Sequence, residues 1–191
     1  QMFKYFGLMD KLNLVKLDPK FDRITFEGDE KVYAHQQGYE AFAKGLINDF
    51  PGEEEAIRKY CKTLQEVCSH FPLYSLQYSD DDYLEDKVLS IGVKEFLDNL
   101  TPNKKLQAVL AGSNMLYAGM ADKTPLYVHA LVVNTYIESS YRCVDGGAQI
   151  AKHLSRSIRQ KGGEVLRRKE VTHFEYSGKT IAKTNSEFTE R

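Results

Sequence analysis

Histidines are the side chains of this sequence best suited to acid–base chemistry, and they are scattered over separate segments: His35, His70, His129, His153 and His173. Only the fold could therefore assemble a catalytic triad from them. The sequence has neither the Gly-x-Ser-x-Gly motif of a serine hydrolase nor the His-Glu-x-x-His motif of a zinc protease. His129 stands out because it lies in the most apolar predicted helix, where burial without a partner would be costly. The sequence assigns no catalytic residue.

Tyrosines form the second group of candidate site residues. Six of the twelve could line an apolar channel with a few polar points, which is typical of a small-molecule pocket: Tyr74, Tyr78, Tyr117, Tyr127, Tyr136 and Tyr141. The alternative is that these rings only pack a helical core. The predicted substrate pocket comprises Tyr117, Tyr127, His129 and Tyr136.

The segment from Tyr141 to Val171 has a glycine pair at each end of one helical pattern, followed by a short strand. Asp145 is expected to cap the helix, and Gly162 is expected to end it. Gly146 and Gly147 would let the backbone approach a phosphate or cofactor, or would merely connect two elements. The apolar stripe of this helix comprises Ile150, Ala151, Leu154 and Ile158.

Charge and cysteine usage exclude several classes of function. The 26 basic and 27 acidic residues give a net charge of −1, which argues against a general polyanion binder. Basic residues between 152 and 169 lack interleaved aromatic rings, so a solvated helix face is favoured over a nucleic-acid site. The acidic run Asp80–Asp82 is interpreted as a solvated cap rather than a cation site. Cys61 and Cys68 are interpreted as core thiols rather than metal ligands, and no metal site is predicted.

The elements that must position these residues predict an α+β fold, with a small, mainly antiparallel sheet covered by a layer of helices. Residues 13–18, 23–27 and 31–36 are expected to form an antiparallel meander. Helical periodicity follows from residue 38 onward, and a C-terminal helix and β-hairpin end the chain. No run of 18 apolar residues and no signal pattern occur, so the cytoplasm is the expected location.

Four segments, in this order, resemble flavin-dependent oxidoreductases of the phytoene desaturase, carotenoid isomerase and retinol saturase group. Three of them read LVKLDPKFDRITFEGDEKVYAH, NDFPGEEEAIRKY and SIGVKEFLDNLT. The fourth contains Gly146-Gly147, then Ile150, Leu154 and Ile158, then Gly162-Gly163-Glu164-Val165, and finally Val171.

The resemblance implies that residues 1–140 are the substrate-binding or cap domain of a longer enzyme. Residues 141–191 would be a connecting loop, helix and hairpin that belong partly to an absent FAD-binding domain. Val171 matches the position whose backbone meets the adenine of FAD, and Gly146 and Gly147 match the loop between the two domains. The glycine fingerprint for the FAD pyrophosphate is missing, so FAD is expected in the whole enzyme and not on this chain alone. The first residue, Gln1, also leads us to expect an excised piece.

The implied reaction is desaturation, saturation or isomerisation of an apolar, polyene-like substrate on a flavin. The second hypothesis is a stand-alone helical binding or interaction module without catalytic activity. A small apolar substrate is the expected partner, nucleic acid and transmembrane segments are not expected, and peripheral membrane contact is left open. Residues 2–12 and the hairpin after Val171 should be apolar and exposed, so the chain is expected to self-associate.

Overall fold

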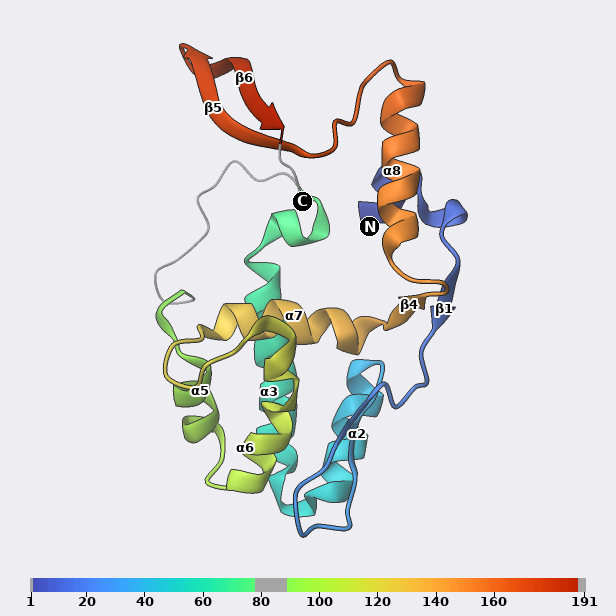
Figure 1. Ribbon diagram of the computed structural model, residues 1–191. Helices are drawn as coiled ribbons and strands as arrows, with labels where there is room; N and C mark the ends of the chain where they lie inside the picture. Colours follow the sequence, from blue (N-terminus) through green and yellow to red (C-terminus); the bar gives the residue numbers. More distant parts are fainter. Residues whose placement is uncertain (1, 78–88, 189–191) are drawn as a thin grey trace.

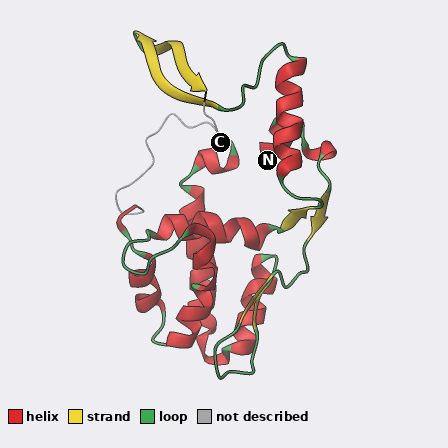
Figure 2. Ribbon diagram, in the orientation of Figure 1, coloured by secondary structure: helices red, strands yellow, loops and turns green. Residues whose placement is uncertain are grey.

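The computed structural model describes residues 2–77 and 89–188 and shows a helical layer, three small sheets and a C-terminal arm (Figure 1). The predicted acidic cap at Asp80–Asp82 lies outside the described residues, as do Tyr78 and Tyr83. Figure 2 shows most of the helices gathered in the lower part of the view, with α8 apart from them and the longest strands in the hairpin of the arm.

Five helices make up the layer: α2 (Tyr39–Asp49), α3 (Glu54–Ser69), α5 (Val93–Leu100), α6 (Lys104–Leu110) and α7 (Leu126–Glu138). Helix α2 ends just before the Phe50-Pro51 step, because a residue that precedes proline is disfavoured in helical geometry. Asn103 caps α6 by accepting a hydrogen bond from the Leu106 amide at 3.1 Å. The sequence predicted all five segments as helices, and the structure confirms them.

Helix α7 organises the core, because it is apolar nearly all round and packs against α2, α3 and α5. Figure 1 shows it lying across α3. Its inward residues join those of α3, including Ile57, Leu64 and Cys68, in one buried cluster. Cys61 and Cys68 are free and buried there, as predicted, and burial raises the pKa of each thiol to about 12. Both therefore stay protonated and unreactive near neutral pH.

The strands differ in pairing from the predicted meander. Strand β2 (Asp22–Ile24) pairs with β3 (Tyr33–His35) as expected, but β1 (Leu14–Lys16) pairs with β4 (Tyr141–Cys143). The antiparallel α+β class is confirmed, with the strands of the described residues divided among three two-stranded sheets. A hydrogen bond extends the β1–β4 pairing toward the end of α7: the Leu17 amide donates to the Ser140 carbonyl at 2.9 Å.

The C-terminal arm comprises α8 (Ala148–Gln160), β5 (Lys169–Ser177) and β6 (Thr180–Phe188). Gly162 ends α8 with a positive φ of 79°, and the Gly163 amide donates to the Ile158 carbonyl at 2.9 Å. This helix end and the predicted hairpin are confirmed, but the turn falls at Gly178 and Lys179, because Ser177 still pairs with Thr180. The expected strand from residue 164 starts only at Lys169, because Arg168 has a left-handed backbone. No residue of α8, β5 or β6 is buried.

The N-terminal segment lies beside α8 in Figure 1 and contains α1 (Met2–Tyr5) and a 3-10 turn, η1 (Met9–Lys11). Leu8 and Leu12 are buried outside the main core cluster. Met2, Tyr5 and Phe6 are exposed by 59%, 77% and 49%, which confirms the expected apolar exposure of this segment.

Candidate functional site

Gly146 and Gly147 lie in the turn between β4 and α8. Gly146 has a φ of 89°, and a Cβ built on either glycine would meet no atom within 4 Å, so the outer side of the turn is open. The predicted Asp145 cap is wrong, because this residue has a left-handed backbone and α8 begins without a side-chain cap. Gln149 stabilises the turn instead, donating to the Val144 and Gly146 carbonyls at 2.7 and 3.0 Å.

Val171 lies in β5 opposite Ser186, with 49% of its surface exposed. The whole of α8 lies between Val171 and the glycine turn in the sequence. This helix has 13 residues and is about 20 Å long. Among the described residues, no parallel strand leads into a glycine-rich loop and helix, which is the arrangement that cradles a dinucleotide pyrophosphate. Gly146, Gly147 and Val171 are thus exposed positions on separate elements, and the described residues around them form no pyrophosphate site of this kind.

A chain of hydrogen bonds surrounds His129 in the core. The Tyr60 hydroxyl on α3 lies 2.7 Å from His129 Nε2, and the Tyr117 hydroxyl lies 2.7 Å from His129 Nδ1. Tyr117 belongs to the 3-10 helix η4 (Gly112–Tyr117), and its hydroxyl donates to Asn114 Oδ1. Tyr60 and His129 have no exposed surface.

These contacts fix the direction of each hydrogen bond. Because the Tyr117 proton goes to Asn114, the Tyr117 oxygen must accept from His129 Nδ1–H. A neutral imidazole then has a lone pair at Nε2, which accepts from the Tyr60 hydroxyl. We call this the relay: Tyr60, His129, Tyr117 and Asn114, each donating to the next.

Burial keeps the relay neutral. Burial, assisted by the charge that His35 would carry, lowers the pKa of His129 to about 4. Burial also raises the pKa of Tyr117 to about 12 and that of Tyr60 well above its ordinary value. The imidazole and both phenols are therefore uncharged near neutral pH. Because both ring nitrogens of His129 also have hydrogen-bond partners, its burial avoids the free-energy cost expected for an unpartnered polar group.

A second polar network lies further along α7, around Asn134. The Tyr39 hydroxyl donates to Asn134 Oδ1 at 2.5 Å, and Asn134 Nδ2 donates to the Tyr74 hydroxyl at 3.1 Å. The Tyr74 hydroxyl also lies 2.6 Å from Thr135 Oγ1. This network joins α2 and the turn after α3 to α7, so its role is to fix the packing of the layer.

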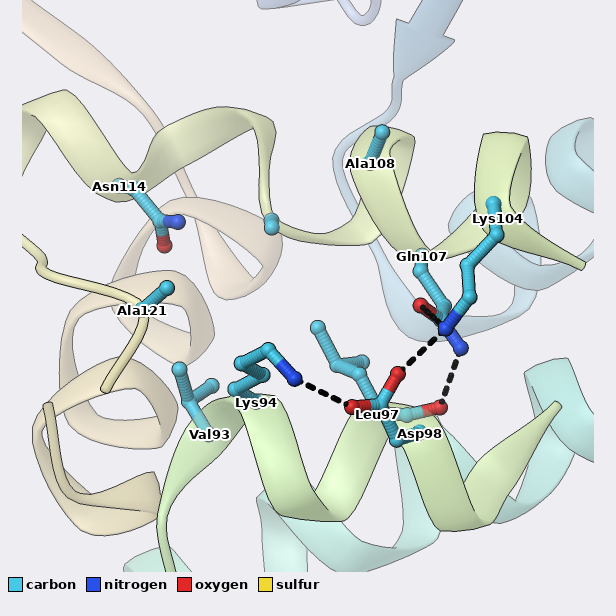
Figure 3. Close-up of a pocket in the computed structure, with 10 residues that line it drawn as sticks. Val93, Lys94, Leu97, Asp98, Lys104, Gln107, Ala108, Asn114 and Ala121 are labelled. Atoms are coloured by element: carbon cyan, nitrogen blue, oxygen red, sulfur yellow. Dashed lines mark hydrogen bonds and ion pairs between the residues drawn. The ribbon is translucent and has the colours of Figure 1, made fainter. Parts of the chain in front are cut away.

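A hollow of about 330 Å³ lies where α5, α6 and η4 meet, shown in Figure 3. Its walls are mainly apolar: Val93, Leu97, Ala108, Ala111 and Ala121. Polar side chains gather at one end, where Asp98 binds Lys94 at 2.8 Å and Lys104 at 2.6 Å. Asn114, the last residue of the relay, lines the other side.

The structure places the four predicted pocket residues in different surroundings. Tyr117 and His129 come together in the relay. Tyr127 stacks on Phe71 at a ring distance of 5.5 Å, and Tyr136 stacks on Phe21 at 6.0 Å. None of the four lines the hollow, although Tyr117 reaches its wall through Asn114.

The sequence did not predict Tyr60 and Asn114 as site residues. Tyr60 contacts His129, which is 69 positions away in the chain, and Asn114 contacts Tyr117, which is 3 positions away. The only signal was a histidine in an apolar helix, which demands buried partners but does not name them. Among residues 2–77 and 89–188, no group of three or more histidine, cysteine or acidic side chains could hold a metal ion. No helix in that part of the chain is long and apolar enough to cross a bilayer.

The fold and site define an α+β unit with a buried core in its helical layer and a C-terminal arm that carries no buried residue. No protein-family model matches the sequence. The chain is similar to proteins named all-trans-retinol 13,14-reductase. It is 30% identical to the human protein over 175 residues, 82% of this chain and 28% of that protein. Identity to the Macaca fascicularis protein is 29% over 180 residues, 84% of this chain and 29% of that protein.

Identity to the Danio rerio protein is 26% over 172 residues, 81% of this chain and 28% of that protein. The chain thus spans less than a third of the length of these relatives. The similarity supports the oxidoreductase group that the sequence resembles, on the retinol saturase side of that group.

Proposed function

We propose that this chain is the substrate-binding portion of a flavin-dependent oxidoreductase that acts on an apolar, polyene-like substrate. The observation that carries the proposal is the similarity to retinol reductases along more than four-fifths of the chain. Among desaturation, saturation and isomerisation, this similarity favours saturation, the reduction of a carbon–carbon double bond.

The division of the chain supports a joint between two domains. Residues 1–140 contain the whole buried core cluster, whereas residues 141–191 expose apolar side chains that a partner domain would cover. Between residues 141 and 188 these are Tyr141, Ile158, Leu166, Val171, Phe174, Tyr176, Ile181 and Phe188. We propose that the arm joins an FAD-binding domain of the longer protein, and that without it the chain self-associates through these residues.

A bound flavin would supply the hydride chemistry. The chain would contribute exposed backbone at Gly146, Gly147 and Val171, which bear no side chain or only a short one against the cofactor. The helical layer would position the substrate and exclude water from it. Tyr117, backed by His129, and the rings of Tyr127 and Tyr136 are the proposed substrate-facing groups.

A stand-alone binding module is the second candidate, and one observation favours it. The buried core lies wholly outside the arm, and two hydrogen-bond networks within it hold the buried side chains of His129 and Asn134, so the arm contributes nothing to this core. We propose a cytoplasmic location, with peripheral membrane contact as a further route to an apolar substrate.

The test compares the chain alone with the complete protein that contains it. We expect the complete protein to purify with flavin absorbance and the 191-residue chain to purify without it. Tight, stoichiometric flavin on the chain alone would refute the missing FAD domain. A complete protein without a second domain and without flavin affinity would leave the binding module as the function.

A further inference from the structure

Asn114 is held in one orientation by the relay behind it. Its Oδ1 accepts the Tyr117 proton, and the Tyr117 oxygen in turn accepts from His129 Nδ1–H. An amide whose oxygen is committed must present its NH2 group on another side. Among the described residues, Nδ2 of Asn114 has no hydrogen-bond partner.

The hollow gives this amide an apolar setting. Figure 3 shows Asn114 extending from η4 toward Ala121, on the side of the hollow opposite the ion pairs of Asp98. Val93, Ala111 and Ala121 offer only hydrocarbon nearby. A fixed donor among apolar walls is typical of a small-molecule site, and about 330 Å³ lies at the lower end of the usual range of volumes.

We propose that this hollow binds a small apolar molecule through one acceptor oxygen, which takes a hydrogen bond from Asn114 Nδ2. The apolar body of the molecule lies against Val93, Leu97 and Ala108. The residues of this site all lie in or next to the helical layer, so the site does not depend on the proposed flavin-binding function.

Charged side chains at the other end of the hollow balance one another. The bonds to Lys104 and Lys94 lower the pKa of Asp98 to about 2, so its carboxylate stays ionised. The ammonium groups of Lys94 and Lys104 both bind Asp98, and the charge of Asp122 also acts on Lys94, so no excess positive charge is left there. An alcohol and a carboxylate can both accept from Asn114 Nδ2, and a carboxylate can also interact with the Lys94 ammonium, whereas a protonated amine has no lone pair with which to accept.

The experiment follows the side-chain amide signals of Asn114 by NMR in the full chain, with 1-hexanol, hexanoate and hexylamine as probes. We expect hexanol and hexanoate to shift the Asn114 amide and the backbone signals of α5 and α6, and hexylamine to do so least. Lys94→Met should weaken hexanoate and leave hexanol unchanged.

Two variants separate the donor from its orientation. Asn114→Asp retains an acceptor for the Tyr117 hydroxyl but removes the donor, so the affinity for hexanol should fall about tenfold. Tyr117→Phe keeps the donor but frees its orientation, and should weaken hexanol to a lesser extent. Equal hexanol affinity in Asn114→Asp and in the unmodified chain would overturn the proposal.

Ala108→Leu provides a test that leaves the relay intact. Ala108 lines the hollow and is exposed, so a larger side chain fills the space without disturbing the core. Both oxygen-bearing probes should lose binding in this variant. Probe shifts that persist in Ala108→Leu would place binding elsewhere and contradict the inference, even if Asn114→Asp failed to fold.

Discussion

His129 should make the protein lose stability as the pH falls from about 6.5 toward 4. Burial lowers the pKa of this imidazole from 6.5 to about 4 in the folded state. The unfolded chain therefore binds a proton that the folded chain refuses, and the contribution is complete above about pH 6.5 and lost progressively below it. A shift of about 2.5 pKa units corresponds to about 3 kcal/mol by the usual conversion.

The measurement is the free energy of unfolding in urea at a series of pH values from about 7.5 to 4.5. Burial also lowers the pKa of His35, so the unmodified chain should show a slope that exceeds one proton. Asp29 and Asp98, whose ion pairs lower each pKa from 3.8 to about 2, contribute below this pH window and do not confuse the slope.

His129→Gln removes the titrating group and keeps an amide that can bond to Tyr60 and Tyr117. The variant should lose about one proton, or about 1.4 kcal/mol per pH unit, from the slope below pH 6.5. Val133→Ala, at a buried site of the same helix, is the matched control: it should lower stability by about 1–2 kcal/mol at every pH without changing the slope. Equal slopes for His129→Gln and the unmodified chain would show that His129 does not have a lowered pKa in the folded state.

Three further predictions concern stability, reactivity and association. Tyr60→Phe leaves Nε2 of His129 buried without a donor and should cost about 1–3 kcal/mol in urea unfolding; an unchanged midpoint would argue against the relay. Cys61 should react with a maleimide only as fast as the chain unfolds, because its thiol is buried with a pKa of about 12; rapid labelling of the folded chain would contradict this. The chain should self-associate on concentration, and Phe6→Ser with Ile158→Ser should reduce this in a light-scattering dilution series. A chain that stays monomeric at all concentrations would refute self-association through these exposed apolar residues.

Local patterns predicted most of the helices. The spacing of Ile57, Leu64 and Cys68 specifies the buried face of α3 with information carried by the segment itself. The segment of α7 is apolar nearly all round and was expected to be buried or to line a cavity, and the structure buries its inward residues in the core. The stop at Gly162 followed in the same way from local geometry.

Long-range contacts explain what the sequence did not predict. Strand β1 pairs with β4 more than a hundred residues later, and no local pattern specifies that partner. Asp145 failed as a cap because the chain needs its left-handed backbone to turn from β4 into α8. The histidine alone did not identify its partners, since Tyr60 lies 69 residues away and Asn114 bonds only through Tyr117.

We propose that this chain serves the reduction of an apolar polyene on a flavin as part of a longer protein. The most direct test is an anaerobic single turnover, in which the complete protein with reduced flavin is mixed with all-trans-retinol and the flavin spectrum and product mass are followed. We expect the flavin to become oxidised as a product with two additional hydrogens forms. With the chain alone, we expect no flavin oxidation and no product. A complete protein whose reduced flavin is unchanged by retinol and by other apolar polyenes would contradict this proposal.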